Sequence, residues 1–486
     1  MSDDGSVEGL RAESAGLRAE VAALTSANEL LAGQVVVLTG KIAELEKRLS
    51  KDSSNSSKPP SSDRFKKPRP ESPNRAARRA EGRKPGKQPG TDGKHLAQID
   101  DPDDVELHVP GCCDGCGGDL AEAPVEAVEV RQVFDLPDPR LHTVEHRAET
   151  RRCGCGTKTK AVFPADARSY ASYGPKLRAV ALYLLAYQHL PFERCQATLR
   201  DLFAVDVSTG FLDSLFTEGG DGLVLFMAAV LGHLLASDVV HVDETFDHVG
   251  KKKAYIHVVC SELYTFLHAD ETRGKDGTER TGLFPDYTGT AVHDRLVQYF
   301  GYTNATHAVC AAHLIRELVS VGHDPVQRPW ASAMTALLYT MNTTAHAARA
   351  AGASQIDPDI LAKFIADYDQ VVADALDFNP APGPGLKRSK LEAESYNLAV
   401  AFRDHRDAIR RFATDLRVPF TNNRAESDLR MVKLHSKISG PFRNMAGAER
   451  FATVRSYLST ARKHHLGPFQ VLTALFAGQP WIPQRI

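Results

Sequence analysis

Residues 239–245, Val-Val-His-Val-Asp-Glu-Thr, are a short run of β-branched residues that ends in two acids. Two further strand-like runs, 254–260 and 263–268, follow closely, and the three together predict a meander of neighbouring strands. Residues 290–294, Thr-Ala-Val-His-Asp, repeat the pattern of a brief apolar stretch that ends in an aspartate. The run at 307–310 leads into a helix, and strands followed by a helix predict a mixed α/β sheet.

The two aspartates of these runs, Asp243 and Asp294, fall where predicted strands end. Mg²⁺ takes one or two carboxylates and keeps water and substrate phosphate as its other ligands. The sequence therefore predicts a site for a hard cation at these strand ends.

A third group of polar residues, 421–433, reads Thr-Asn-Asn-Arg-Ala-Glu-Ser-Asp-Leu-Arg-Met-Val-Lys. Asn423 with Glu426 three residues later fits a capping box, in which the glutamate only satisfies a backbone N–H at the start of a helix. Arg430 and Lys433 follow Glu426 on the same helical face, where they would align an acid and two cations toward one phosphodiester. We prefer this second interpretation.

The eight cysteines comprise two close groups and three isolated positions. Residues 112–116 read Cys-Cys-Asp-Gly-Cys and residues 153–155 read Cys-Gly-Cys, as a tetrahedral thiolate zinc site requires. We predict a structural zinc bound by Cys113, Cys116, Cys153 and Cys155. Because the Cys-x-Cys pair is compressed, three side chains are alternative ligands: Cys112, His142 and His146. Inert buried thiols are the other interpretation, and the isolated cysteines are interpreted as core residues: Cys195, Cys260 and Cys310.

Leucine recurs at every seventh residue from Leu10 to Leu45, at the d positions of a heptad repeat. Three of the six matching a positions carry β-branched residues, a combination that favours a parallel two-stranded coiled coil. Asn28 at an a position would specify the dimer, because its amide pairs with its twin in the correct register. We predict a dimerisation helix over residues 8–50; a single amphipathic helix packed on its own domain is the alternative.

Residues 51–95 are rich in Ser, Pro, Lys and Arg and contain hardly any large apolar residue, so they cannot form a core. This stretch holds thirteen basic and five acidic residues, whereas the whole chain of 486 residues has 59 basic and 61 acidic ones. Such a cationic arm suits sequence-independent contact with DNA phosphates, because each contact releases counterions. A merely solvated linker is the alternative.

Residues 170–236 carry helical periodicity. Residues 192–203 predict a short helix, 204–207 a turn, and Ser208 an N-cap that opens a second helix. These elements fit a DNA-reading helix-turn-helix and two ordinary packed helices equally well.

Neither a membrane span nor a secretory signal is predicted. The longest nearly apolar run, 223–236, has 14 residues, short of the ~20 that cross a bilayer. The N-terminus is acidic where a secretory signal would be basic. We expect a cytoplasmic protein, in which paired cysteines indicate metal rather than disulfides.

Together the motifs resemble those of the transposases of the insertion sequence 66 family. The resemblance rests on Asp243-Glu-Thr, Val292-His-Asp294, Cys310-Ala-Ala-His313-Leu-Ile-Arg316-Glu-Leu and Asn422-Asn-Arg-Ala-Glu426-Ser-Asp-Leu-Arg430-Met-Val-Lys433. The run 52–63, Asp-Ser-Ser-Asn-Ser-Ser-Lys-Pro-Pro-Ser-Ser-Asp, lies between the leucine heptads and the paired cysteines and is similar to that family's N-terminal half. The resemblance covers nearly the whole chain, in order.

The resemblance implies an RNase H-like catalytic fold of the Asp-Asp-Glu type, with Asp243, Asp294 and Glu426 as its acids. Asp294 lies 51 residues after Asp243, and Glu426 lies 132 residues after Asp294, which leaves room for a helical insertion. The expected organisation is a coiled-coil dimerisation helix (8–50), a basic disordered linker (51–98), a zinc-binding module (99–165), a helical region with the candidate helix-turn-helix (166–236), the first part of the catalytic core (237–320), the helical insertion (321–415), and the second part of the core with C-terminal helices (416–486).

The three acids would repel each other until cations bind, and two Mg²⁺ ions would activate the attacking and leaving oxygens of an in-line displacement. Water would cleave a phosphodiester at the element end, and the resemblance implies that the freed 3′-hydroxyl then attacks target DNA. The candidate substrate-binding residues are Arg430, Lys433, His313 and Arg316. His241, Glu244 and His313 are candidates for contact with the substrate or with the residues that hold the metal, and each fits a structural role equally well.

The expected partners are element-end and target DNA, a second copy of the chain, and small accessory proteins of the same element, at the nucleoid of a bacterial cytoplasm. Two alternative functions stay open. One is a catalytically inactive, dimeric, zinc-containing regulator that binds DNA. The other is a structural scaffold dimerised by the coiled coil.

Overall fold

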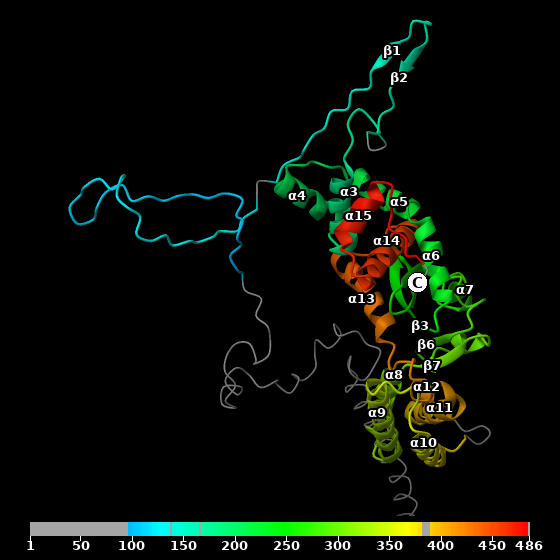
Figure 1. Ribbon diagram of the computed structural model, residues 1–486. Helices are drawn as coiled ribbons and strands as arrows, with labels where there is room; N and C mark the ends of the chain where they lie inside the picture. Colours follow the sequence, from blue (N-terminus) through cyan, green and yellow to red (C-terminus); the bar gives the residue numbers. More distant parts are fainter. Residues whose placement is uncertain (1–95, 137–138, 165–166, 382–388, 485–486) are drawn as a thin grey trace, which may run out of the picture. The chain divides into compact units, whose positions relative to one another are not determined.

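The computed structural model describes residues 96–136, 139–164, 167–381 and 389–484 (Figure 1). The coiled coil predicted over 8–50 and the basic arm over 51–95 lie outside the described residues, so both stay predictions.

The chain divides into two compact units, and each is described by itself: Lys66–His142, and Met1–Phe65 with Thr143–Ile486. In the smaller unit, the extended chain folds back on itself. The side chain of Gln132 accepts the N–H of Ile99 at 2.8 Å and donates to the Ile99 carbonyl at 2.7 Å. The larger unit contains the sheet and all the long helices among the described residues.

The larger unit is built around a five-stranded sheet with the strand order β5-β4-β3-β6-β7. Its strands are β3 (Val239–Val249), β4 (Lys252–Cys260), β5 (Thr265–Asp270), β6 (Thr290–His293) and β7 (Thr306–Val309). β3, β4 and β5 form an antiparallel meander, whereas β6 and β7 run parallel to β3. The predicted mixed α/β sheet is confirmed.

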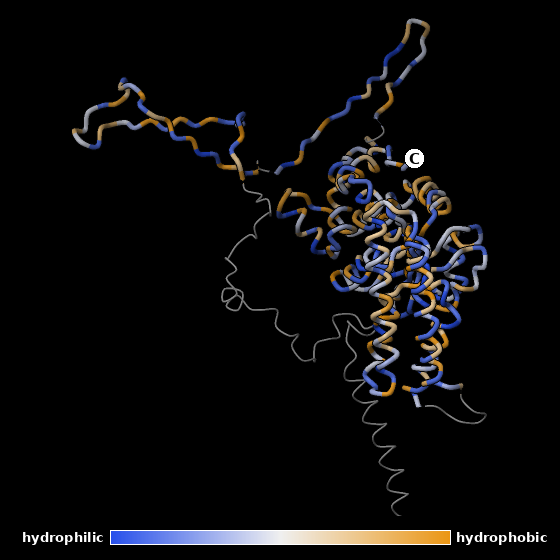
Figure 2. Tube along the Cα trace, turned by 60° about the horizontal axis from the view of Figure 1, so that its bottom comes forward, coloured by the Kyte–Doolittle hydropathy of each residue, from blue (hydrophilic) through white to orange (hydrophobic). Residues whose placement is uncertain are grey.

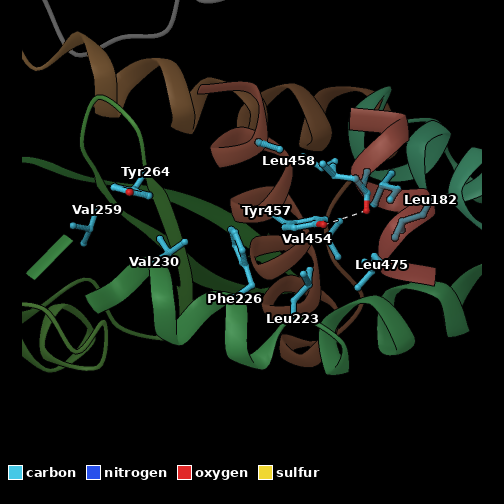
Figure 3. Packing of buried hydrophobic residues seen from close by; sticks show 14 of the residues in the cluster. Leu182, Leu223, Phe226, Val230, Val259, Tyr264, Val454, Tyr457, Leu458 and Leu475 are labelled. Atoms are coloured by element: carbon cyan, nitrogen blue, oxygen red, sulfur yellow. Dashed lines mark hydrogen bonds between the residues drawn. The ribbon is translucent and has the colours of Figure 1, made fainter. Parts of the chain in front are cut away.

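One face of the sheet is covered by α6 (Val224–Leu235). Phe226 and Val230 of this helix share a hydrophobic cluster with Val242 of β3. Figure 3 shows Phe226 beside Tyr457 of α14 (Met445–Lys463), with ring centroids 4.9 Å apart and the rings nearly perpendicular. Fully burying one such side chain contributes about 1.5–3 kcal/mol, so this cluster fixes the helices on the sheet.

The opposite face is covered by α13 (Asn423–Ser439) and α14. Leu429 and Val432 of α13 pack with Val258 of β4 and Leu267 of β5. Asp243 pairs with Val258 across β3 and β4, so alternation along the strands turns Asp243 toward this face. The first turn of α13 therefore begins over the strand that carries Asp243.

Helices also precede the sheet. They are α3 (Pro175–Leu182), a π-helical turn (Tyr183–Tyr187), α4 (Phe192–Phe203) and α5 (Thr209–Asp221), and α15 (Pro468–Phe476) packs against α3. The hydroxyl of Ser208 accepts the N–H of Phe211 at 3.0 Å, so it caps α5 as predicted. In the described part of the chain, no single helix is long and apolar enough to cross a membrane, although α5 and α6 pass that test as a pair bent by 49°.

A group of helices separates β7 from α13. It contains α8 (Ala311–Val321), α9 (Arg328–Ala350), α10 (Pro358–Phe378), α11 (Lys390–Asp404) and α12 (Arg406–Thr414). Their buried residues form a hydrophobic cluster of their own, which Val292 and Val309 of the sheet join. Figure 2 shows hydrophobic and hydrophilic residues mixed along these helices, as expected where one stripe faces a core. Helices thus fill the interval in which the insertion is predicted.

The remaining elements are short. They are β1 (Thr150–Arg152), β2 (Lys158–Lys160), α7 (Lys275–Glu279) and a 3-10 turn (Val297–Gly301).

Candidate functional site

Asp243 lies on β3, and Asp294 directly follows β6, the parallel strand beside it. The last pair in the register of β3 and β6 joins His241 to Val292. The same register, extended by two residues on each strand, places Asp294 across from Asp243. Because residues two apart point to the same side of a sheet, both carboxylates share the face that α13 covers.

Electrostatic repulsion at Asp243 indicates that the third predicted acid is close by. The pKa of Asp243 is raised from 3.8 to about 8, first by burial and then by the negative charges of Glu244, Asp294 and Glu426. The N–H of Glu244 donates to Asp243 Oδ1 at 2.8 Å, and this hydrogen bond lowers the pKa of Asp243. Acids gathered in this way fit a divalent cation.

The raised pKa of Asp243 predicts a pH-dependent stability for the chain without Mg²⁺. Between pH 3.8 and about 8, folded Asp243 keeps a proton that it loses on unfolding. Stability should therefore fall across this interval as pH rises. The Asp243→Asn variant lacks this titration, so its melting temperature should exceed the wild-type value by a margin that grows toward pH 8, reaching about 2 °C or more. A margin that is constant between pH 5 and pH 8 would contradict the raised pKa.

Glu244, the acid next to Asp243 on β3, is fully engaged in hydrogen bonds. Arg273 donates to its Oε1 at 2.8 Å, and the hydroxyl of Tyr299 donates to its Oε2 at 2.6 Å. The side chain is almost completely buried. These contacts favour the structural interpretation of Glu244, whose role is to hold Arg273 and Tyr299 beside the acids.

The capping-box interpretation of Asn423 and Glu426 is wrong. The helix α13 begins at Asn423, so the N-cap position belongs to Asn422, which makes no capping bond with its side chain. Asn422 instead turns toward the sheet: its Nδ2 donates to the Val242 carbonyl at 2.8 Å, and its Oδ1 lies 2.9 Å from His241 Nδ1. Glu426 is consequently free of a capping role.

Asn422 connects the start of α13 to the strands of the sheet. Besides its contacts with β3, its backbone N–H donates to Cys310 Sγ at 3.1 Å, at the end of β7. The side chain is completely buried. Asn422 therefore joins three segments: β3, the end of β7 and the start of α13.

His241 is the hydrogen-bond partner of the Asn422 side chain on β3. Burial lowers its pKa to about 4, so the imidazole is neutral at pH 7, and its hydrogen bond to Asn422 opposes the shift. A buried neutral ring whose Nδ1 faces an amide oxygen favours the structural interpretation of His241 over contact with a substrate.

His313 and Arg316, two of the predicted substrate-binding residues, lie against Glu426. Glu426 Oε1 is 3.6 Å from Arg316 Nη2 and 3.8 Å from His313 Nδ1. Both distances are within ion-pair range but too long for a direct hydrogen bond. The structure thus brings these residues to the third acid.

Arg430 and Lys433 are exposed on α13, on the same helical face as Glu426. Neither forms an ion pair with any described residue. Lys437, one turn further on, extends the same exposed row. The row starts at an acid of the cluster and leads away from it, as a phosphate backbone entering the site would require.

The two cysteine groups are described separately, because they belong to different units. In the smaller unit, the N–H of Gly117 donates to the Cys113 carbonyl at 2.8 Å, and the N–H of Cys113 donates to the Gly118 carbonyl at 2.8 Å. The pKa of the Cys113 thiol is lowered, chiefly by the backbone N–H of Cys116. The lowered pKa favours the thiolate form of Cys113, which is the form that binds zinc.

The second group lies between β1 and β2 in the larger unit. The N–H of Gly156 donates to the Cys153 carbonyl at 2.9 Å, closing a similar turn. The pKa of the Cys155 thiol falls to about 7, mainly because of its hydrogen bond with the side chain of Thr157. Each turn therefore has the local chemistry of half a zinc site.

The helix pair α4 and α5 is a weak candidate for a DNA reader. α5 contains no lysine or arginine and carries three acids: Asp213, Glu218 and Asp221. Glu218 pairs with Arg168 at 2.7 Å. A helix inserted between DNA phosphates needs positive charge and donors on its exposed face, so α5 fits the role of an ordinary packed helix better.

Three models of protein families match parts of this chain. A model described as the Transposase IS66 family matches residues 171–450, more than half of the chain. A model described as the zinc-finger binding domain of transposase IS66 matches residues 110–156, which contain all the paired cysteines. A model of a family of unknown function matches residues 6–97. No curated protein matches the chain.

Proposed function

The chain belongs to the IS66 family of transposases, and from this premise we propose that it is an Asp-Asp-Glu enzyme with an RNase H-like core that cleaves insertion-sequence ends and joins them to target DNA. The observation that carries the proposal is that Asp243 and Asp294 share the sheet face covered by α13, and that the charges of Asp294 and of Glu426 on α13 help to raise the pKa of Asp243. The strand order, an antiparallel meander followed by two parallel strands, is consistent with an RNase H-like core.

Asp243, Asp294 and Glu426 would hold Mg²⁺ in this proposal. When bound, two Mg²⁺ ions supply Lewis-acid activation of the attacking and the leaving oxygen. With the phosphodiester positioned by Arg430 and Lys433, the oxygen of water would attack phosphorus and give up a proton, while the bond to the 3′-oxygen breaks and that oxygen takes up a proton. In the second step, the freed 3′-hydroxyl would lose its proton and attack the phosphorus of a target phosphodiester, whose bond to its own 3′-oxygen breaks as that oxygen takes up a proton.

The test of the function is a nicking assay with the full-length chain, Mg²⁺ and a duplex that carries an element end. We expect a single-strand break at the element end that requires Mg²⁺. Tight binding of the same duplex without any break would instead support a catalytically inactive DNA-binding regulator.

Arg430 and Lys433 are proposed to position DNA phosphates. Each phosphate contact contributes about 0.9 to the slope of log affinity against log salt concentration. The Arg430→Ala and Lys433→Ala variants should therefore bind all duplexes more weakly and each lose about one unit of this slope. Fluorescence anisotropy at several salt concentrations measures it. Lys363→Ala, on α10, is the control, and a slope that matches it in both variants would reject the role.

The match to the zinc-finger domain supports a structural zinc, and we propose Cys113, Cys116, Cys153 and Cys155 as its ligands. The Cys116→Ser variant should retain one zinc ion fewer per chain than the wild type after desalting, measured by plasma mass spectrometry. Cys260→Ser, which changes an isolated buried thiol of β4, should retain the wild-type content. Equal zinc in Cys116→Ser and wild type would exclude Cys116 as a ligand.

The predicted coiled coil over 8–50 and the basic arm over 51–95 complete the proposal. The first would pair two copies of the chain, and the second would bind DNA of any sequence through its positive charge. Accessory proteins of the same element are further proposed partners.

A further inference from the structure

A second set of metal-ligating side chains meets at Glu426. Cys310 lies just before α8, and His313 lies in the first turn of that helix. Ligand atoms of Cys310, His313 and Glu426 all lie within 4.8 Å of one another. This set contains sulfur and nitrogen as well as oxygen, so it differs in kind from the all-carboxylate set of Asp243, Asp294 and Glu426.

The polar atoms of this set are buried but not satisfied by each other. His313 Nδ1 and Glu426 Oε1 are both inaccessible to solvent and have no hydrogen-bond partner among the described residues. They stand 3.8 Å apart, whereas a directly bonded imidazolium and carboxylate would approach to about 2.7–2.9 Å. The two atoms therefore lie close together without bonding to each other.

The buried thiol completes the set. Cys310 is fully buried, and its Sγ already accepts the N–H of Asn422 at 3.1 Å. Zinc-bound thiolates are held in place by hydrogen bonds from surrounding groups in the same way. Arg316, with Nη2 3.6 Å from Glu426 Oε1, is the only described cation in ion-pair range of this carboxylate besides His313, and a bound metal would have to displace it.

We propose that Cys310, His313 and Glu426 form a binding site for one thiophilic divalent cation of the Zn²⁺ or Cd²⁺ class, and that its occupation inhibits the enzyme by withdrawing Glu426 from the two aspartates. A Cys-His-carboxylate set with an open fourth position suits Zn²⁺, whereas Mg²⁺ prefers oxygen ligands throughout. The inhibitory part rests on the proposed function, but the binding part does not.

The binding test uses the full-length chain with Cd²⁺ as the probe. Wild-type protein is equilibrated with Cd²⁺, desalted and analysed for metal per chain, beside Cys310→Ser and His313→Ala. We expect the wild type to retain one more Cd²⁺ than either variant, and the affinity of the variants to fall by at least ~10-fold. The zinc-finger cysteines are present in all three proteins and cancel in the comparison.

Cys195→Ser is the matched control, because it removes another buried thiol that has no histidine or carboxylate partner among the described residues. It should retain as much Cd²⁺ as the wild type. Equal Cd²⁺ in wild type, Cys310→Ser and His313→Ala would overturn the proposal.

The inhibition test measures nicking in excess Mg²⁺ as Cd²⁺ is added. Wild type and Cys195→Ser should be inhibited at Cd²⁺ concentrations ~10-fold or more below those that inhibit Cys310→Ser. Retention of the extra Cd²⁺ without this difference would contradict the sharing of Glu426 but not the metal site. If the wild type does not nick at all, the proposed function fails while the binding test still decides the site.

Discussion

The Asp243→Asn variant should lose Mg²⁺-dependent nicking of element-end DNA by about 10³-fold or more while binding the same DNA with nearly unchanged affinity. The negative charges of Glu244, Asp294 and Glu426 all help to raise the pKa of Asp243, so Asp243 lies close to the other acids. Asparagine keeps the shape of the side chain but removes one anionic ligand. Metal ions contribute several kcal/mol to transition-state stabilisation, and each 1.4 kcal/mol is a factor of ten in rate.

Asp247→Asn provides a matched control on the same strand. Asp247 is also a buried aspartate of β3, and its Oδ1 accepts bonds from the His248 N–H and the Ser436 hydroxyl. Asparagine can keep both bonds, and neither partner belongs to the acid cluster. This variant should nick at close to the wild-type rate. Comparable losses in both variants would point to a general effect on β3 and would reject Asp243 as a metal ligand.

The strands and the order of the acids were accessible from the sequence because they depend on local patterns. β-branched runs that end in acids predict strands with carboxylates at their ends. Asp294 directly follows β6 in this way, whereas β3 continues to Val249, so the prediction that Asp243 lies at a strand end is wrong. The N-cap at Ser208 and the turn before it were also predicted from residues adjacent in sequence, and α5 begins at Thr209 as expected. The buried positions of Cys195, Cys260 and Cys310 also agree with the sequence.

The roles of single polar residues depend on partners that are remote in sequence. Glu244 could not be assigned because Arg273 and Tyr299, which occupy its carboxylate, come from other segments. The capping box failed because a side chain at a helix start can bond either to its own helix or to a neighbouring strand. Asn422 does the latter, and no local spacing distinguishes the two outcomes.

The same distance in sequence hides the metal-ligating set at Glu426. Cys310 and His313 form a recognisable Cys-x-x-His pair, but their third member lies on α13 beyond the helical insertion. Only the packing of α13 across the sheet brings Glu426 to α8 and to Asp243 together. The insertion is compatible with the site because its helices pack into a hydrophobic cluster of their own, and the chain after them continues into α13 on the sheet.

The Asn422→Ala variant should lower the nicking rate by about 10²-fold, because it releases the start of α13 from the strand that carries Asp243. The substitution removes the amide that bonds to the Val242 carbonyl and faces His241 Nδ1. Each buried group left without a partner costs about 1–3 kcal/mol, and the helix can relieve that cost only by moving. A shift of 1 Å at a catalytic group is enough for a loss of this size.

Asn422 would act as a positioning residue, so its test needs a measurement that simple destabilisation does not change. Single-turnover nicking should require a higher Mg²⁺ concentration for half-maximal rate, because Glu426 is no longer held beside the aspartates. Asn379→Ala is the matched control: Asn379 is also buried and donates two hydrogen bonds, to Gln327 and Ala375, but within the helical insertion. Its stability should fall similarly while its Mg²⁺ requirement stays at the wild-type value. If both variants, assayed well below their melting temperatures, share the wild-type Mg²⁺ requirement, Asn422 supports the fold alone, and the position of Glu426 must be set by the packing of Leu429 and Val432 against the sheet.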